Sequence, residues 1–164
     1  MEPFYLTKQL TRNTGTTQYS AGDVISDSNG DPIEFTDKFN KNDIVIITTA
    51  ELMSNRDDTA TLAFDLQLWL FDSVIADRAD NLAFNITDDE MATHVGIIEF
   101  PSTGVKVGLA SGNVKVQGNP DKLPLQFDCL GNKFWGQLVV RNAYTPASAE
   151  IFTMRLGGWI WHRK

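Results

Sequence analysis

The chain has 164 residues, of which 42% are hydrophobic and 21% are charged, and its formal net charge is −7. A chain of this length fits one domain that buries about 70% of its unfolded surface, so it needs no metal or disulfide for stability. Its 14 Lys and Arg residues are scattered along an acidic chain, so we expect no binding to nucleic acid. No apolar run approaches the ~18 residues of a membrane span, and the N-terminus does not resemble a secretory signal, so we expect no membrane association.

Residues 1–17 are polar and rich in Thr, and they show no sustained periodicity. This pattern predicts an N-terminal arm, in which Phe4 and Tyr5 act as anchors. The rest of the chain, residues 18–164, alternates short apolar segments with clusters of Gly, Pro, Asn and Asp that are typical of turns. It therefore predicts a second unit built from strands.

Strands are expected at residues 19–25, 42–52, 61–72, 94–100, 104–109, 113–116, 123–129, 133–141 and 150–161. About nine short strands at this spacing are typical of a sandwich or a jelly roll. The sequence therefore predicts an all-β, jelly-roll-like antiparallel β-sandwich over residues 18–164.

The clearest strand signal lies in residues 61–72. Large apolar side chains occupy every second position there: Leu62, Phe64, Leu66, Leu68 and Leu70. A helix would spread these five around its axis, whereas a strand gathers them on one face, because successive side chains alternate. The opposite face ends in Trp69 and Phe71, which indicates that this end contacts another strand, a loop or a partner.

Two further features interrupt the strand pattern. Thr87, with Glu90 three residues later, has the spacing of a capping box and predicts at most one short helix. The pair Gly157-Gly158 lies inside the last expected strand and predicts a β-bulge there.

No group of residues in the sequence indicates catalysis. His94 and His162 are isolated from each other, and we expect His94 to be structural and His162 to lie too close to the C-terminus for a catalytic geometry. The single cysteine, Cys129, forms no internal disulfide and predicts a buried, inert thiol. The oxygen-bearing residues at 27, 29 and 31 have calcium-loop spacing but lack the Gly and distal Glu of an EF-hand, so an ordinary turn is favoured. We expect a protein without enzymatic activity, cofactor or metal.

The tryptophans give the sequence-based candidates for an interaction surface. Trp159 and Trp161 are two residues apart, so on a strand they share a face. Such a pair can close a core, anchor a subunit contact or stack on sugar rings, and the first two are favoured because large aromatic side chains dominate both settings. The candidate interface residues are Phe4, Tyr5, Trp69, Phe71, Trp159 and Trp161.

Six short motifs follow one another at residues 19–25 (YSAGDVI), 66–71 (LQLWLF), 76–81 (ADRADN), 95–100 (VGIIEF), 123–127 (LPLQF) and 143–148 (AYTPAS). In their order and spacing they resemble a family of small structural proteins of tailed phages. The resemblance covers residues 19–152, whereas the tryptophan-containing segment 157–164 departs from the pattern of the family.

This resemblance implies a jelly-roll-like virion protein that decorates or cements a bacteriophage capsid. Its implied partners are the major capsid protein and further copies of itself, in a homotrimer at capsid three-fold positions that bridges neighbouring capsid proteins. Its implied location is the capsid surface of the virion, after synthesis in the host cytoplasm. Two alternatives stay open: a glycan-binding jelly-roll module for host attachment, which needs Trp69, Trp159 or Trp161 exposed, and an adaptor in the tail or baseplate.

Overall fold

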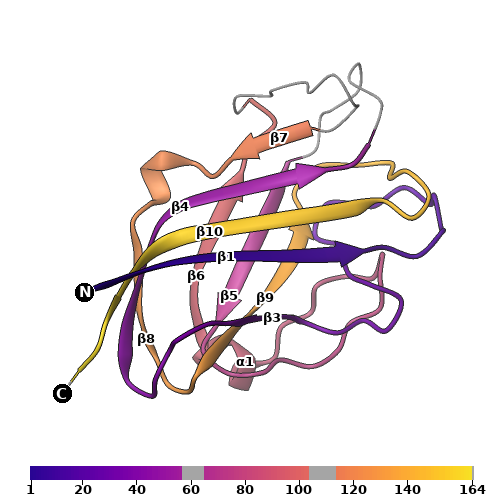
Figure 1. The fold of residues 1–164 in the computed structure, drawn as a ribbon. Coiled ribbons are helices and arrows are strands. Elements are labelled where there is room, and N and C mark those ends of the chain that lie inside the picture. The colour runs from indigo at the N-terminus through magenta and orange to yellow at the C-terminus, as the bar shows by residue number, and fades with distance from the viewer. Residues whose placement is uncertain (57–64, 104–113, 164) are drawn as a thin grey trace.

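The computed structural model describes residues 1–56, 65–103 and 114–163. Within them the chain folds into two antiparallel sheets that pack face to face, with one short α-helix at the lower end of the view in Figure 1. This confirms the all-β sandwich predicted from the sequence. The N-terminus and the C-terminal end of the described chain lie on the same side of the molecule (Figure 1).

The first sheet is built around the last strand of the chain. In it, β1 (Glu2–Thr11) pairs with β10 (Ile151–Trp161), and β10 pairs with β4 (Asp43–Ser54). The far edge of β4 pairs with two shorter strands, β7 (Val114–Gln117) and β8 (Leu125–Cys129). The long strands β1, β10 and β4 form the front layer in Figure 1.

The second sheet is centred on β9 (Lys133–Val140). One edge of β9 pairs with β2 (Val24–Ile25) and β3 (Ile33–Thr36), and the other edge pairs with β5 (Leu66–Phe71), which in turn pairs with β6 (His94–Phe100). The chain passes repeatedly from one sheet to the other, as in jelly-roll sandwiches.

The core lies between the two sheets and follows from the alternation of side chains along the strands. Leu66, Leu68 and Leu70 are fully buried, as their spacing predicts, whereas Leu62 and Phe64 lie outside the described residues. Both sheets contribute large side chains with no exposed surface, among them Phe35, Leu52, Phe100, Phe134, Leu138 and Phe152.

The arm predicted over residues 1–17 is in large part a strand of the sandwich. All ten residues of β1 pair with β10, from Glu2 opposite Ile160 to Thr11 opposite Ile151. Phe4, Leu6 and Leu10 point into the core, so the segment is amphipathic with a period of two. Polar Thr, Lys and Gln residues between and beside these positions hide that period in the sequence.

The remaining elements agree with the sequence in part. The helix α1 (Asp88–Ala92) begins with the predicted capping box, in which Thr87 and Glu90 each accept a hydrogen bond from the backbone of the other. The strand expected at 19–25 is shortened to β2 and two isolated bridges, and β3 and the 3-10 turn η1 (Pro120–Lys122) were not expected. The strand expected at 104–109 lies outside the described residues. None of the described helices has the length and apolar character needed to cross a membrane.

Candidate functional site

The outer face of the first sheet is open and aromatic. Tyr5, Trp159 and Trp161 point away from the core, and they are 64%, 44% and 55% exposed. Across the strand pairs, Trp159 lies opposite Pro3 of β1 and opposite Ile46 of β4, so these side chains share its face. We call Pro3, Tyr5, Ile46, Trp159 and Trp161 the aromatic face.

The register between β10 and β4 shifts by one residue partway along the two strands. Gly157 lies opposite Thr49, whereas Gly158 lies opposite Ile47, so Thr48 is an extra residue in β4. The hydroxyls of Thr48 and Thr49 lie within hydrogen-bonding distance of the carbonyl oxygen of Gly157, at 3.3 and 3.4 Å. The bulge predicted from the two glycines is confirmed in position, and its extra residue belongs to the neighbouring strand.

This bulge decides which side chains of β4 reach the aromatic face. One extra residue reverses the alternation of all residues beyond it. Val45 and Ile47 therefore point into the core, where they are fully buried, and Ile46 points outward beside Trp159. The aromatic face depends on this change of alternation.

An imidazole between two carboxylates holds the C-terminal end of the aromatic face. Nδ1 of His162 lies 2.8 Å from Oδ2 of Asp43, at the start of β4, and Nε2 lies 3.2 Å from Oε2 of Glu2, at the start of β1. Lys38 Nζ lies 2.5 Å from the other carboxylate oxygen of Glu2. Hydrogen bonding to Glu2 and then to Asp43 raises the pKa of His162. The beginnings of two strands are thus joined to the residue that follows Trp161.

The chain itself covers much of the outer face of the second sheet. The ring of Phe84 packs edge-on against Trp69, with centroids 5.3 Å apart, and the His94 ring lies 4.9 Å from the same indole. Burial lowers the pKa of His94, which packs as the structural histidine expected from the sequence. Trp69 is half-buried and borders a groove of about 500 Å³ whose lining also includes Met91 and Arg141.

The structure divides the six candidate interface residues. Tyr5, Trp159 and Trp161 are exposed on one face, and Trp69 is half-buried on the other sheet. The two phenylalanines are not available at the surface, which corrects the expectation for both.

Phe4 points inward because residues alternate along β1, and its ring packs edge-on against Phe39 at 5.5 Å. Phe71 has no exposed surface because the chain returns alongside the end of β5. There the N–H of Asp72 donates to the carbonyl of Thr93, and the His94 ring packs against Phe71 at 5.5 Å. Neither burial can be read from the local pattern.

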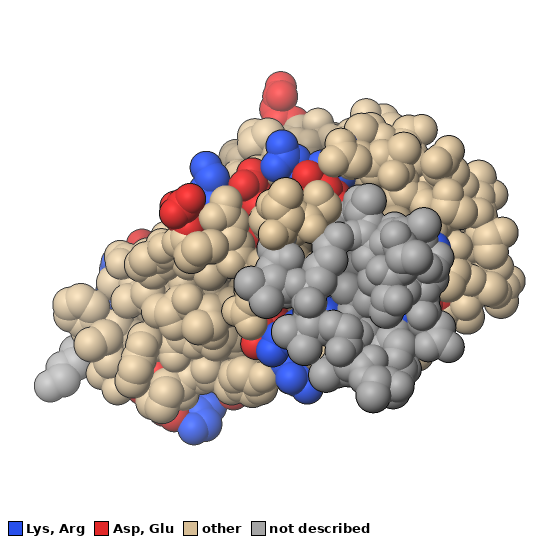
Figure 2. Space-filling view, turned by 90° about the horizontal axis from the view of Figure 1, so that it is seen from above, with Lys and Arg blue, Asp and Glu red and all other residues tan. Residues whose placement is uncertain are grey.

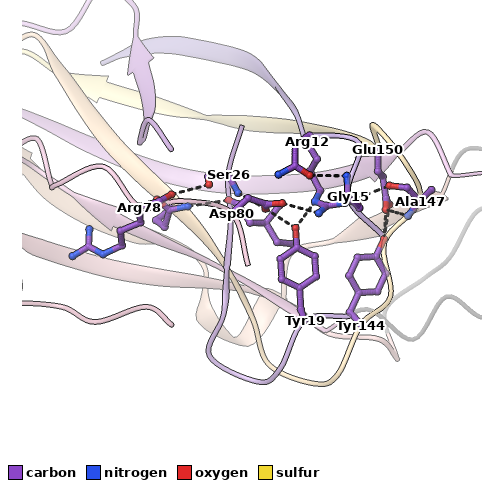
Figure 3. Close-up of polar contacts among 12 residues, drawn as sticks. Arg12, Gly15, Tyr19, Ser26, Arg78, Asp80, Tyr144, Ala147 and Glu150 are labelled. Atoms are coloured by element: carbon purple, nitrogen blue, oxygen red, sulfur yellow. Dashed lines mark hydrogen bonds and ion pairs between the residues drawn. The ribbon is translucent and has the colours of Figure 1, made fainter. Parts of the chain in front are cut away.

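A buried ion pair, which the sequence did not indicate, joins the loops at the other end of the sandwich (Figure 3). Arg12 Nη2 lies 2.7 Å from Oδ2 of Asp80, and the two side chains are 2% and 3% exposed. The hydroxyl of Tyr19 donates to Oδ1 of Asp80 at 2.6 Å, and the N–H of Ser26 donates to the same oxygen at 3.1 Å. Burial and the Asp80 contact raise the pKa of Tyr19.

A second buried carboxylate lies beside this pair in Figure 3. Glu150 is 1% exposed and accepts hydrogen bonds from the hydroxyls of Ser54 and Tyr144 and, at 3.0 Å, from the N–H of Ala147. The rings of Tyr144 and Tyr19 stack at 6.1 Å. In each cluster the polar groups are hydrogen-bonded to one another inside the fold. Each cluster therefore holds its loops together.

Within the described ranges, no three His, Cys, Asp or Glu side chains lie close enough together to hold a metal ion. The turn at 27–31 is capped by Asp27, whose Oδ1 accepts the N–H groups of Asn29, Gly30 and Asp31 at 2.9, 2.9 and 3.3 Å. Cys129 is fully buried, and burial raises its pKa, so the buried thiol expected from the sequence is confirmed.

Charged side chains of both signs lie next to one another on the sheet. Glu51 of β4 lies 2.5 Å from Lys115 and 3.8 Å from Arg155. Figure 2 shows the same mixture, with acidic and basic atoms side by side and broad uncharged areas around them. Among the described residues visible there, no large area carries one sign of charge.

No protein-family model matches the sequence, and no curated protein sequence matches it. The solved structures to which the chain is similar include two of the native virion of Kashmir bee virus. At neutral pH the TM-score is 0.32 with 10% identity, over 97% of this chain and 70% of the other. At acidic pH the TM-score is 0.32 with 11% identity, over 97% and 70% of the two chains. Similarities this distant assign no role to any residue.

Proposed function

We propose that this protein is a non-enzymatic structural component of a phage virion. In this proposal it binds the outside of the capsid and stabilises it by bridging neighbouring major capsid proteins, as a decoration or cement protein. The observation that carries the proposal is the aromatic face, where Tyr5, Trp159 and Trp161 project from an open sheet. Trp and Tyr are enriched at the centres of protein interfaces, because they offer large, rigid contact areas with a polar tip.

The contrast between the two sheets supports this assignment. On the second sheet, Phe84 and His94 pack against Trp69, and His94 packs against Phe71, which is fully buried. On the first sheet the described residues leave Trp159 and Trp161 about half exposed. Single exposed apolar residues are common on soluble proteins, whereas a contiguous group is typical of an interaction surface.

The phage assignment is supported by the six motifs that resemble small structural proteins of tailed phages. Self-association into a homotrimer is part of the proposal, because a trimer at a three-fold position of a capsid meets three equivalent contacts. Sedimentation of the purified protein tests this part, and a strictly monomeric protein at all concentrations would contradict it.

The main experiment adds purified protein to capsids stripped of their outer proteins. We expect wild-type protein to bind at micromolar concentration and to raise the resistance of the capsids to heat or chelation. Trp159→Ser and Trp161→Ser should fold but lose most of this binding. The control is Val74→Ser, which removes an apolar side chain that is more exposed than either tryptophan and lies outside the aromatic face. Absence of wild-type binding, or equal losses in all three variants, would contradict the proposal.

A glycan-binding module is the second candidate, because Trp159 and Trp161 are exposed on one face at a spacing suited to stacking on sugar rings. A glycan array followed by NMR of the indole N–H groups tests it. Hits that disappear in Trp161→Ser would favour this candidate, and an array without hits would remove it. Immunogold labelling of virions separates a capsid protein from a tail or baseplate adaptor, because the adaptor would be labelled on the tail.

A further inference from the structure

Each ring nitrogen of His162 lies within hydrogen-bonding distance of a carboxylate, and the side-chain amide of Asn40 lies 3.3 Å from Nδ1. Nδ1 faces Asp43 at 2.8 Å and Nε2 faces Glu2 at 3.2 Å. An ionised carboxylate has no proton to donate, and a neutral imidazole carries one N–H only. Both contacts are therefore hydrogen bonds only when the ring is the doubly protonated imidazolium.

The charged groups around this contact have partners of their own. Lys38, next to Asp37 in the loop before β4, is paired with Glu2 at 2.5 Å. Arg163, the residue after His162, is paired with Asp128 of β8 at 2.8 Å. Among the described residues, His162 is the one cationic partner of the buried Asp43 carboxylate.

Loss of one proton would disturb the imidazole more than either carboxylate. Asp43 keeps the backbone N–H of Asn40 at 2.7 Å and its side-chain amide at 3.3 Å, and Glu2 keeps Lys38. The ring, in contrast, then points a lone pair at one carboxylate oxygen, which repels it. At Nδ1 the side-chain amide of Asn40, 3.3 Å away, offsets only part of this repulsion, because the carboxylate of Asp43 is closer, at 2.8 Å. The weak point is thus the C-terminal end of β10 rather than the beginnings of β1 and β4.

Trp161 lies at this weak point. The pairing of β1 with β10 begins at Glu2 opposite Ile160, so Trp161 has a strand neighbour on β4 only, at Ile44. Strand ends with few partners open most easily. The position of the Trp161 indole therefore depends on what holds the following residue, His162.

We propose that His162 is a pH-dependent clamp on the aromatic face: the doubly protonated ring holds the Trp161 end of β10 against β1 and β4, and loss of a proton releases it. Resting on the function proposed above, the consequence is that the protein binds its capsid partner more tightly in mildly acidic than in alkaline solution. The clamp regulates the interaction surface without unfolding the sandwich.

The direction follows from the contacts. The pKa of His162 is raised by Glu2 first and by Asp43 second. A group whose pKa is raised on folding stabilises the folded state below its ordinary pKa, about 6.5, and this contribution is lost as the pH rises through the folded pKa. The clamp is therefore closed at acidic pH. It opens as the pH rises through the pKa that His162 has in the folded protein.

The experiment measures two quantities on the free protein by NMR: the pKa of His162, and the protection of the Trp161 amide against hydrogen exchange, corrected for intrinsic exchange. We expect the pKa in wild type to lie above its ordinary value and to fall in Glu2→Gln. We also expect protection of Trp161 to fall several-fold between about pH 5.5 and about pH 8.5. In His162→Lys, which keeps its charge over this range, protection should not depend on pH.

The matched control is Glu34→Gln, which neutralises an exposed carboxylate paired with Lys133 at 2.8 Å on another strand. It should leave the His162 pKa and the Trp161 protection unchanged. An unshifted His162 pKa, or protection with the same pH dependence in His162→Lys as in wild type, would overturn the clamp. Since these measurements need no capsid, a protein that shows the clamp but binds no capsid at either pH would contradict the proposed function and leave the clamp standing.

Discussion

Gly158 of β10 lies directly against the backbone of Ile46 in β4, with no room for a side chain. A Cβ atom at Gly158 would overlap the carbonyl oxygen of Ile46 and would lie 3.0 Å from the Cα of Ile47. This close approach occurs beside the bulge at Thr48, where the alternation of β4 reverses. The aromatic face thus depends on Gly158, although this residue is not part of the face.

We predict that Gly158→Ala destabilises the protein by about 1–3 kcal/mol or more, the range found for overpacked sites, because the obstructing atoms are backbone. The measurement is the midpoint of urea unfolding followed by tryptophan fluorescence. Gly131→Ala is the control, since the nearest atoms to its Cβ are 4.0 Å away. Similar stability of the two variants would show that β10 can move away from β4 at this point.

We predict that Arg12→Met costs about 3–5 kcal/mol of unfolding free energy, because it leaves the Asp80 carboxylate buried without a cation. Lys133→Met breaks the exposed pair with Glu34, and we expect a change of about 0–1 kcal/mol. Urea unfolding at neutral pH compares the two. Equal effects would mean that the Arg12–Asp80 pair is solvated in solution.

We predict that Glu90 makes the stability depend on pH in acid. Burial raises the pKa of Glu90, but hydrogen bonds from Arg78, Thr87 and Ala76 outweigh burial and lower the pKa to about 2. A depressed pKa stabilises the fold above the ordinary value of 4.5, and this contribution is lost as the pH falls from there to about 2. Wild type should exceed Glu90→Gln in stability at neutral pH, and the two should converge across that interval.

Thermal unfolding at several pH values checks this prediction. Asp89→Asn is the control, because it removes a negative charge from the first turn of the same helix but not the contact with Arg78. A constant gap between wild type and Glu90→Gln from neutral pH to about pH 2 would contradict the assignment.

We predict that Cys129 reacts slowly with thiol reagents in the folded protein and fast in denaturant. Its side chain is fully buried, its sulfur contacts the carbonyl oxygens of Gly131 and Lys133 at 3.5 Å, and burial raises its pKa, so little thiolate forms. Mass spectrometry after timed alkylation measures the two rates. Rapid labelling without denaturant would indicate that the end of β8 opens in solution.

Features set by neighbouring residues were predictable. The three leucines of β5 share one face because a strand alternates, and the capping box of α1 lies within four residues. The bulge at Gly157-Gly158 was predictable in position, because two glycines interrupt a strand that is otherwise mostly apolar. In each case the physical cause acts over a few residues of chain.

Features that depend on distant pairing were not predictable. β1 is a strand because it pairs with β10 at the opposite end of the chain, and that pairing turns Phe4 inward and Tyr5 outward. Phe71 is buried where the ring of His94, from the next strand along the chain, packs against it. The pattern of β5 does not show the burial of Phe71, and in β1 the polar Lys8 interrupts the period of two.

The sequence by itself determined an all-β sandwich, the position of helix α1 and the buried thiol, because alternation and capping act between neighbours. Only the tertiary structure decided which aromatic side chains stay exposed, that Asp80 pairs with Arg12, and that His162 lies between Glu2 and Asp43. Those contacts join residues 68 to 160 positions apart, and their energies depend on burial and charge that exist only once both sheets have formed.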